Sequence, residues 1–237
     1  MNEKTRLSTR TGTETASHQT RISFTGNEKH LITLEEAIRF TQNHRRSAPE
    51  GSMLGGFFGR QIITKLLNQE TCVGIRIYFS SQDDGTPTFV LAGVNANNSD
   101  LFQGFLGAHP IMSDSALEQR LSEDSSLDQT ADSQTFSGQE NHLTTLAEAS
   151  RLTRNFRDSA KRMVYKGGFF GKNIFSKILG QPECVGIFIY YAQLDNGKPT
   201  LVLAGVDRMG RHFAKWPFGE DILLCPPFCA ATNPLNH

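Results

Sequence analysis

The feature that most constrains the fold of this chain is an internal duplication. The motif Gly-Gly-Phe-Phe-Gly occurs at residues 55–59 and again at residues 167–171, 112 positions later. The same offset relates the sequence on both sides of the motif. Copies of one sequence build copies of one structural unit, and such units bury their apolar surfaces against each other. We therefore expect a tandem duplication in which each copy forms the same α+β unit.

Each copy begins with a helix signal. Thr33 and Glu36 form a capping box, and Thr145 and Glu148 repeat it. Apolar residues follow at helical spacing, and an Asp-Gly or Asn-Gly turn later joins two strand patterns. The expected elements of the two copies are a first helix ending near residues 47 and 159, a second helix over 60–68 and 172–180, a strand over 72–79 and 184–191, a hairpin turn over 82–85 and 194–197, and a return strand over 88–94 and 200–206.

We interpret the Gly-Gly-Phe-Phe-Gly motif as the hinge between the two helices of each unit, because glycine allows a tight turn. A phosphate-binding loop would require Gly-Lys followed by Ser or Thr. The second copy has Asn173 after Lys172, and the first copy has Arg60 in place of the lysine. The motif is therefore expected to serve the fold rather than to bind an anion.

The predicted organisation has four parts: a disordered arm over 1–24, a first helix–helix–strand–strand repeat over 25–112, an acidic linker over 113–136, and a second repeat over 137–237 that ends in a Cys-Pro-Pro-Phe-Cys wrap. A single hairpin is marginally stable. Two antiparallel hairpins side by side would form a four-stranded sheet packed against the helices. The alternative is two separate domains, since each repeat is long enough to fold alone.

Charge and composition exclude some classes of protein. Lys plus Arg and Asp plus Glu both number 24, so the chain lacks the basic excess typical of a nucleic-acid-binding protein. No apolar run is long enough for a membrane span, and the polar N-terminus does not resemble a secretory signal. Cys72 and Cys184 occupy equivalent strand positions, which is typical of buried thiols in a reducing compartment. We expect a cytoplasmic protein.

A cysteine nucleophile is one candidate chemistry. It would need a base within reach and a lowered pKa. His30 and His142 are the duplicated histidines, and each precedes the cysteine of its repeat. The candidate pairs are therefore Cys72 with His30 and Cys184 with His142. The competing interpretation is a small buried side chain and a histidine at the entry of a helix.

Cys225 and Cys229 form a cysteine cluster near the C-terminus. One interpretation is a reversible disulfide in a redox-responsive protein. The other is a rigid segment that packs Phe228 on the core. A zinc site needs four ligands, and His212 and His237 lie at unsuitable spacing, so we expect no metal and no cofactor.

Arg151, Arg154 and Arg157 recur at helical spacing and form a basic stripe. Such a stripe can bind an anion or an acidic partner. The alternative is an ordinary solvated helix face.

Four motifs carry a resemblance to known sequences. They are Cys-Val-Gly-Ile-Phe-Ile-Tyr-Tyr at 184–191, Leu-Val-Leu-Ala-Gly-Val-Asp at 201–207, Cys-Pro-Pro-Phe-Cys at 225–229 and Asn-Pro-Leu-Asn at 233–236. With them, the second repeat resembles a group of small bacterial proteins of uncharacterised function. The resemblance implies a bacterial cytosolic protein, and it transfers no catalytic residue.

No combination of nucleophile, base and orienting group occurs at a convincing spacing. We therefore expect a non-enzymatic binding or assembly module built from two repeats. Its expected partner is a protein, with homo-oligomerisation as one form of assembly, and neither a membrane nor a nucleic acid is expected. An enzyme that uses a Cys–His pair is the first alternative, and a redox-responsive protein acting through Cys225 and Cys229 is the second.

Overall fold

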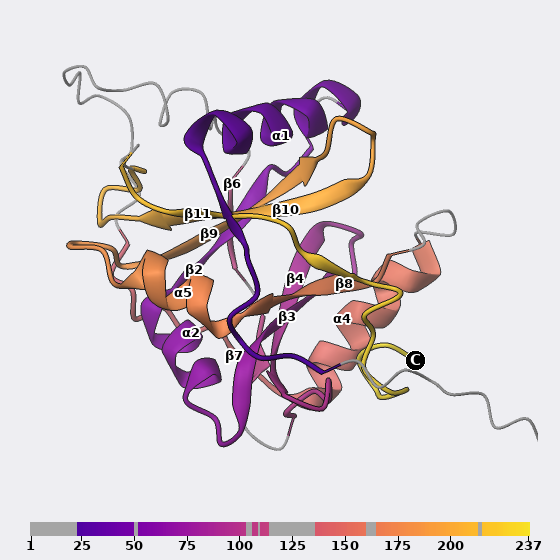
Figure 1. The fold of residues 1–237 in the computed structure, drawn as a ribbon. Coiled ribbons are helices and arrows are strands. Elements are labelled where there is room, and N and C mark those ends of the chain that lie inside the picture. Colours follow the sequence, from indigo (N-terminus) through magenta and orange to yellow (C-terminus); the bar gives the residue numbers. More distant parts are fainter. Residues whose placement is uncertain are drawn as a thin grey trace, which may run out of the picture.

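The structure is a computed structural model of the chain, and it describes residues 23–49, 52–102, 106–108, 110–113, 136–159, 165–212 and 215–237. Most of the predicted N-terminal arm (1–22) and of the predicted acidic linker (114–135) lies outside these ranges. The fold is α+β, with helices packed on antiparallel sheets (Figure 1).

The helices and hairpins lie close to their predicted positions in both repeats. The first repeat contributes β1 (Leu31–Ile32), α1 (Leu34–Ser47), β2 (Gly55–Gly59), α2 (Arg60–Leu67), β3 (Cys72–Ser81), β4 (Pro87–Asn95), β5 (Leu106–Gly107) and β6 (Ile111–Ser113). The second repeat contributes β7 (Leu143–Thr144), α4 (Leu146–Ser159), β8 (Gly167–Gly171), α5 (Lys172–Leu179), β9 (Gly186–Gln193), β10 (Pro199–Val206), β11 (Phe218–Gly219) and β12 (Leu223–Cys225).

Side-chain capping starts the long helix of each repeat. Thr33 and Glu36 form the predicted capping box at α1. At α4 the backbone N–H of Glu148 donates to the Thr145 hydroxyl at 3.2 Å, and the Glu148 carboxylate also accepts from Arg151. These caps satisfy N–H groups that lack a partner within the helix, which explains why both helices begin where the sequence predicts.

The Gly-Gly-Phe-Phe-Gly motif forms a strand in both repeats, so the predicted hinge is wrong. β2 and β8 are buried along their whole length. The backbones approach closely here: a Cβ on Gly74 would lie 2.3 Å from the carbonyl oxygen of Phe170, and one on Gly186 would lie 2.4 Å from that of Phe58. Glycine in a strand permits such an approach, and the local turn signal is overridden by this packing.

Each sheet contains the motif strand of the other repeat. β2 lies beside β9, with Phe57 opposite Phe188, and β8 lies beside β3, with Phe169 opposite Arg76. The strand orders are β1-β11-β10-β9-β2-β6 and β12-β8-β3-β4-β5-β7. The expected four-stranded sheet is therefore replaced by two six-stranded sheets that exchange strands between the repeats.

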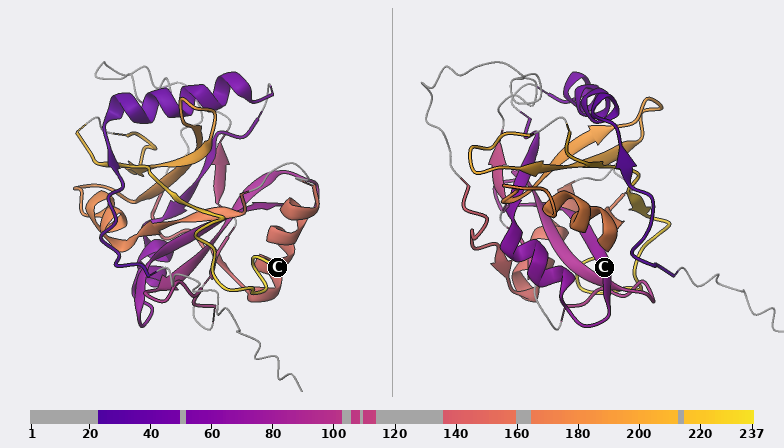
Figure 2. Two further views of the ribbon diagram at one scale, coloured as in Figure 1. Left: turned by 45° about the vertical axis from the view of Figure 1, so that its right-hand side comes forward. Right: turned by 60° about the vertical axis from the view of Figure 1, so that its left-hand side comes forward.

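The long helices cross between the repeats in the same way. α1 packs on β9 and β10 of the second repeat, and α4 packs on β3 and β4 of the first (Figures 1 and 2). The short helices α2 and α5 contact each other and strands of both sheets. Each repeat thus covers the sheet that carries the other repeat's hairpin.

One hydrophobic core joins the two repeats. The central cluster contains Phe58 and Ile62 of the first repeat and Phe170 and Ile174 of the second, each at most 2% exposed, together with residues of both hairpins. Burial of apolar surface stabilises a fold in proportion to its area. Because both repeats bury their apolar surface in the same cluster, the packing of each repeat stabilises the other.

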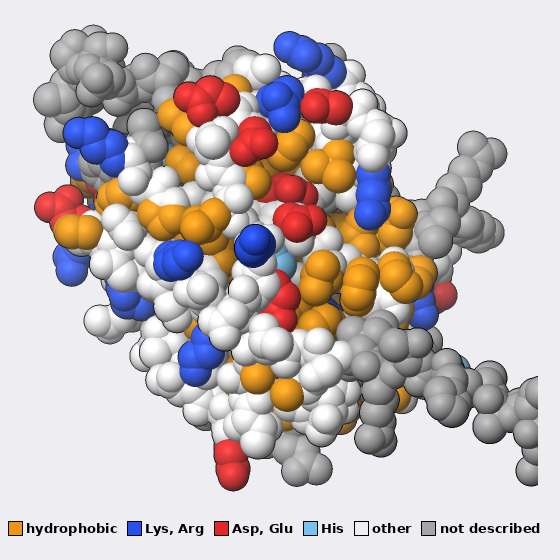
Figure 3. Space-filling view, viewed as in Figure 1, with side chains coloured by type: hydrophobic (Ala, Val, Ile, Leu, Met, Phe, Trp, Pro, Cys, Tyr) orange, Lys and Arg blue, Asp and Glu red, His pale blue; other side chains and the backbone are white. Residues whose placement is uncertain are grey.

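The surface mixes charged and hydrophobic side chains (Figure 3). Hydrophobic side chains gather where the C-terminal segment crosses the face shown. In the C-terminal segment, Pro226 and Pro227 are exposed and Phe228 is partly buried. Within the described ranges, no helix combines the length and apolar character needed to cross a membrane.

Candidate functional site

A cavity of 770 Å³ lies where the two repeats meet. The C-terminal parts of α1 and α4 and the turn ends of the two hairpins line it. Small-molecule sites have volumes in this range, and they form preferentially at interfaces between structural units. The cavity is therefore the first candidate for a functional site.

Four rings line the cavity in a row, which we call the aromatic arc: His44, Tyr191, Phe79 and Phe156. Their successive ring centroids are 5.7, 6.3 and 5.7 Å apart. Such separations are typical of interacting aromatic side chains. The arc therefore presents ring faces and edges against which a flat apolar group can pack.

The aromatic arc is symmetric in position but asymmetric in chemistry. His44 and Phe156 occupy equivalent positions of the two repeats, and so do Phe79 and Tyr191. The cavity is thus lined by equivalent positions of the two repeats. One end of the arc carries imidazole and phenol groups, whereas the other end carries two phenyl rings.

Several polar groups of the lining are already hydrogen-bonded. The Tyr191 hydroxyl donates to the Thr88 carbonyl at 3.3 Å, and the Gln193 amide donates to the Gly197 carbonyl at 2.9 Å. The His44 imidazole makes no hydrogen bond to a described residue, and burial lowers its pKa. A neutral imidazole keeps one donor and one acceptor nitrogen, so His44 can bind a polar group in the cavity.

The cavity suits an uncharged ligand. Its described lining contains no Lys, Arg, Asp or Glu. An ion that entered would lose hydration without gaining an opposite charge, which is unfavourable. The described lining therefore offers a charged group no opposite charge.

The cysteines considered as nucleophiles are buried thiols. Cys72 and Cys184 are 9% and 3% exposed. Their thiols donate to the carbonyls of Gly74 and Gly186, each at 3.2 Å. Burial raises the pKa of Cys184, and a raised pKa favours the thiol over the nucleophilic thiolate.

The duplicated histidines lie against the motif strands of the opposite repeats. His30 Nε2 accepts from the backbone N–H of Gly171 at 3.0 Å, so Nδ1 carries the proton and donates to the Asp221 carbonyl at 3.0 Å. Burial lowers the pKa of His30. The ring of His142 packs against Phe58, with centroids 5.1 Å apart. These contacts give both histidines a role in the strand exchange.

Cys225 and Cys229 form a disulfide. The Asn98 side chain donates to the Cys229 carbonyl at 2.7 Å, and the backbone N–H of Lys166 donates to the Cys225 carbonyl at 2.7 Å. The C-terminal wrap is thus attached to both repeats.

A buried polar network, which the sequence analysis missed, also anchors this wrap. The fully buried Arg76 pairs with Asp100 and donates to Asn98. The other carboxylate oxygen of Asp100 accepts from the Tyr78 hydroxyl at 2.5 Å and from the Asn233 amide at 2.9 Å. A buried charge is costly unless paired, and these contacts pair the two charges, although Arg76 Nε has no hydrogen-bond partner among the described residues.

A comparison of the two repeats could have identified Arg76 and His44 from the sequence. Arg76 interrupts an apolar strand at a position where the second repeat has Phe188. Likewise, His44 stands where the second repeat has Phe156. In both places an aromatic residue in one copy is matched by a polar one in the other.

The predicted basic stripe is divided among different contacts. Arg151 pairs with Asp83, and Arg157 donates to the Leu235 carbonyl at 2.8 Å. Arg154 is exposed. Two of the three guanidinium groups therefore hold parts of the fold together.

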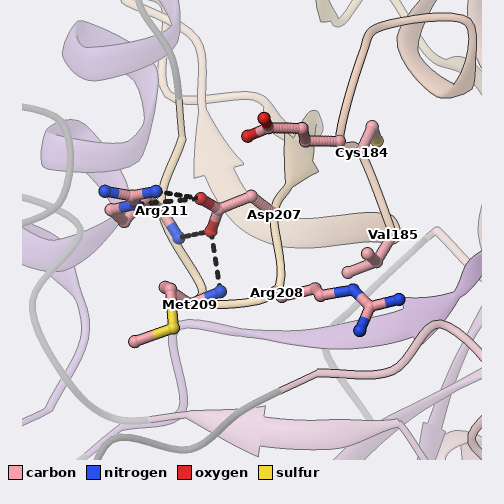
Figure 4. Close-up of a pocket in the computed structure, with 7 residues that line it drawn as sticks. Cys184, Val185, Asp207, Arg208, Met209 and Arg211 are labelled. Carbon is pink, nitrogen blue, oxygen red and sulfur yellow. Dashed lines mark hydrogen bonds and ion pairs between the residues drawn. The ribbon is translucent and has the colours of Figure 1, made fainter.

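A second cavity, of 550 Å³, lies beside Cys184 (Figure 4). The Asp207 carboxylate accepts from the Arg211 side chain at 2.8 Å and from backbone N–H groups two and four residues later. Its counterpart Asn95 makes the same two backbone contacts in the first repeat. The charge on Asp207 is thus used to stabilise a turn, and the aromatic cavity remains the stronger candidate.

No match was found when the chain was compared with models of known protein families, with curated proteins and with solved structures.

Proposed function

We propose that this chain is a non-enzymatic binding module and that its ligand occupies the aromatic cavity. The observation that carries the proposal is the cavity itself, with 770 Å³ of space lined by aromatic side chains from both repeats. The buried thiols and the backbone contacts of His30 support binding over Cys–His catalysis, because they occupy the groups that such an enzyme would need.

A fragment screen by two-dimensional NMR tests this proposal. Fragments that bind should shift the resonances of cavity residues, and Ser47→Trp should abolish binding because Ser47 lines the cavity. Ser176→Trp is the matched control, since both serines are exposed helix residues and Ser176 lies outside the cavity lining. The proposal would be refuted if no fragment bound the wild-type chain, or if every fragment that bound it also bound Ser47→Trp.

A protein partner, which the sequence led us to expect, stays a prediction. Affinity capture with the wild-type chain and with Ser47→Trp tests it. Loss of a captured protein in Ser47→Trp but not in Ser176→Trp would show that the partner inserts a side chain into the cavity.

The disulfide favours a second candidate function, a redox response. A dithiol reductant would transfer two electrons and two protons and open the Cys225–Cys229 bond to two thiols. We expect the melting temperature of the wild-type chain to fall on addition of dithiothreitol, because opening the disulfide removes a cross-link that constrains the unfolded chain. Cys225→Ser should show no response, and an unchanged wild-type melting temperature would count against this function.

A further inference from the structure

We infer that the ligand of the aromatic cavity is a small uncharged molecule with an aromatic ring at one end and a hydroxyl or amide group at the other. This inference rests on the proposed function and specifies its ligand. The ring would pack against the tilted pair of Phe79 and Phe156, and the polar group would bind the imidazole of His44.

The apolar end of the cavity determines where the ring binds. Phe79 and Phe156 come from different repeats, and their centroids are 5.7 Å apart at an interplanar angle of 46°. Tilted rings at this distance offer both an edge and a face to a third ring. Aromatic contacts of this kind add to the free energy gained by burying apolar area.

The polar end determines where the hydrogen-bonding group binds. Tyr191 already donates its hydroxyl proton to Thr88, whereas His44 makes no ring hydrogen bond to a described residue. The half-buried imidazole faces the cavity, and a ligand hydroxyl or amide could hydrogen-bond its ring nitrogens in place of water. The order of ring and polar group along the ligand thus follows from the difference between His44 and Phe156.

A neutral ligand is favoured because no charged side chain occurs in the described lining. The internal duplication shows how the two ends differ. Identical repeats would give a cavity with the same chemistry at both ends, whereas the two pairs His44 with Phe156 and Phe79 with Tyr191 make the ends distinguishable.

Titration of the intact chain with four probes of similar size tests the inference: toluene, p-cresol, benzoate and benzylamine. Binding is followed at pH 7.5 by NMR shifts of cavity residues. We expect p-cresol to bind about five- to tenfold more tightly than toluene, which corresponds to one satisfied hydrogen bond. Benzoate and benzylamine should bind at least about tenfold more weakly than p-cresol, because neither charge has a partner.

Two variants assign the preference to one end of the cavity. His44→Phe installs the residue that the second repeat has at this position, and it should remove the preference for p-cresol while leaving toluene binding unchanged. Ser176→Trp should leave all four affinities unchanged. The His44→Phe variant retains an aromatic ring, so its folding is checked by the unchanged toluene shifts.

Several outcomes would overturn the inference. They are equal binding of toluene and p-cresol, tight binding of either charged probe, an unchanged preference in His44→Phe, or binding of none of the probes. The proposed function would still stand after any of these outcomes if the fragment screen found another ligand whose binding is lost in Ser47→Trp. It would fail separately if the screen found none.

Discussion

The same place in the two repeats is filled by an ion pair in one and by stacked rings in the other. In the first repeat, Tyr78 donates to Asp100, and Asp100 pairs with the buried Arg76. In the second repeat, the equivalents of Tyr78 and Asp100 are Tyr190 and His212, whose side chains meet at 2.6 Å.

An aromatic stack replaces the charge in the second repeat. Phe188 stands at the position of Arg76 and stacks on Tyr190, with ring centroids 4.3 Å apart. The difference follows from what covers each sheet. In the first repeat, Asp100 accepts from Asn233 of the C-terminal segment. The ion pair therefore attaches the C-terminal segment, which has no counterpart in the first repeat.

The largest expected effect comes from breaking this ion pair. Asp100→Ala should lower the free energy of unfolding by about 3–5 kcal/mol, because Arg76 would remain buried without a counter-charge. His212→Ala, at the equivalent position, should cost less, about 1–3 kcal/mol, through the loss of the hydrogen bonds to Tyr190 and to the Gly205 carbonyl. Urea denaturation of both variants measures the difference. Equal losses of unfolding free energy would show that Asp100 and His212 contribute equally to stability.

The next effect tests the two strand crossings against each other. Gly74→Ala and Gly186→Ala should each lower the free energy of unfolding by about 1–3 kcal/mol, because a methyl group would press on the backbone and on the Phe ring of the opposite motif strand. Chemical denaturation measures both. A substitution that left stability unchanged would contradict the close approach in that sheet.

A pH-dependent effect is expected from His30. Its folded-state pKa is lowered by burial, so the unfolded chain binds the proton more readily. Stability is therefore complete above the unfolded pKa of about 6.5 and falls as the pH drops below it. Protonation also removes the acceptor for Gly171. His30→Gln should reduce the loss of stability between pH 7 and pH 5, measured by denaturant titration, and an unchanged slope would contradict this role.

The smallest effect is expected at the hairpin turns. Arg39 pairs with Asp195 at 3.3 Å, and its equivalent Arg151 pairs with Asp83, so each ion pair joins the two repeats. Both pairs are substantially exposed, and exposed ion pairs contribute about 0–1 kcal/mol. Arg39→Ala and Arg151→Ala should therefore change the melting temperature only slightly. A large loss in either would mean that the crossing depends on these charges.

Local signals in the sequence predicted most of the helices and hairpins. The capping residues and the periodicity of α1 and α4, together with the Asp-Gly and Asn-Gly turns, define elements through contacts between neighbours in the chain. The motif strands were missed because their conformation depends on residues far away in sequence. Gly55 and Gly167 act through strands of the opposite repeat, and a turn is the ordinary local interpretation of such glycines.

The candidate site could not be predicted from the sequence because it too depends on contacts between residues far apart in the chain. His44 and Phe156 become neighbours of one cavity only because each long helix covers the hairpin of the other repeat. The Arg76–Asp100 pair likewise depends on strand exchange and on the C-terminal segment. Residues that differ between otherwise similar copies were the available signal for both.

The exchange of strands is the central claim, and nuclear Overhauser effects across β2 test it most directly. The structure places Phe57 opposite Phe188 of the second repeat. Backbone contacts between these two residues are the predicted result. Contacts between Phe57 and Arg76, the equivalent residue of its own repeat, would mean that each repeat pairs its own strands, and they would contradict the account.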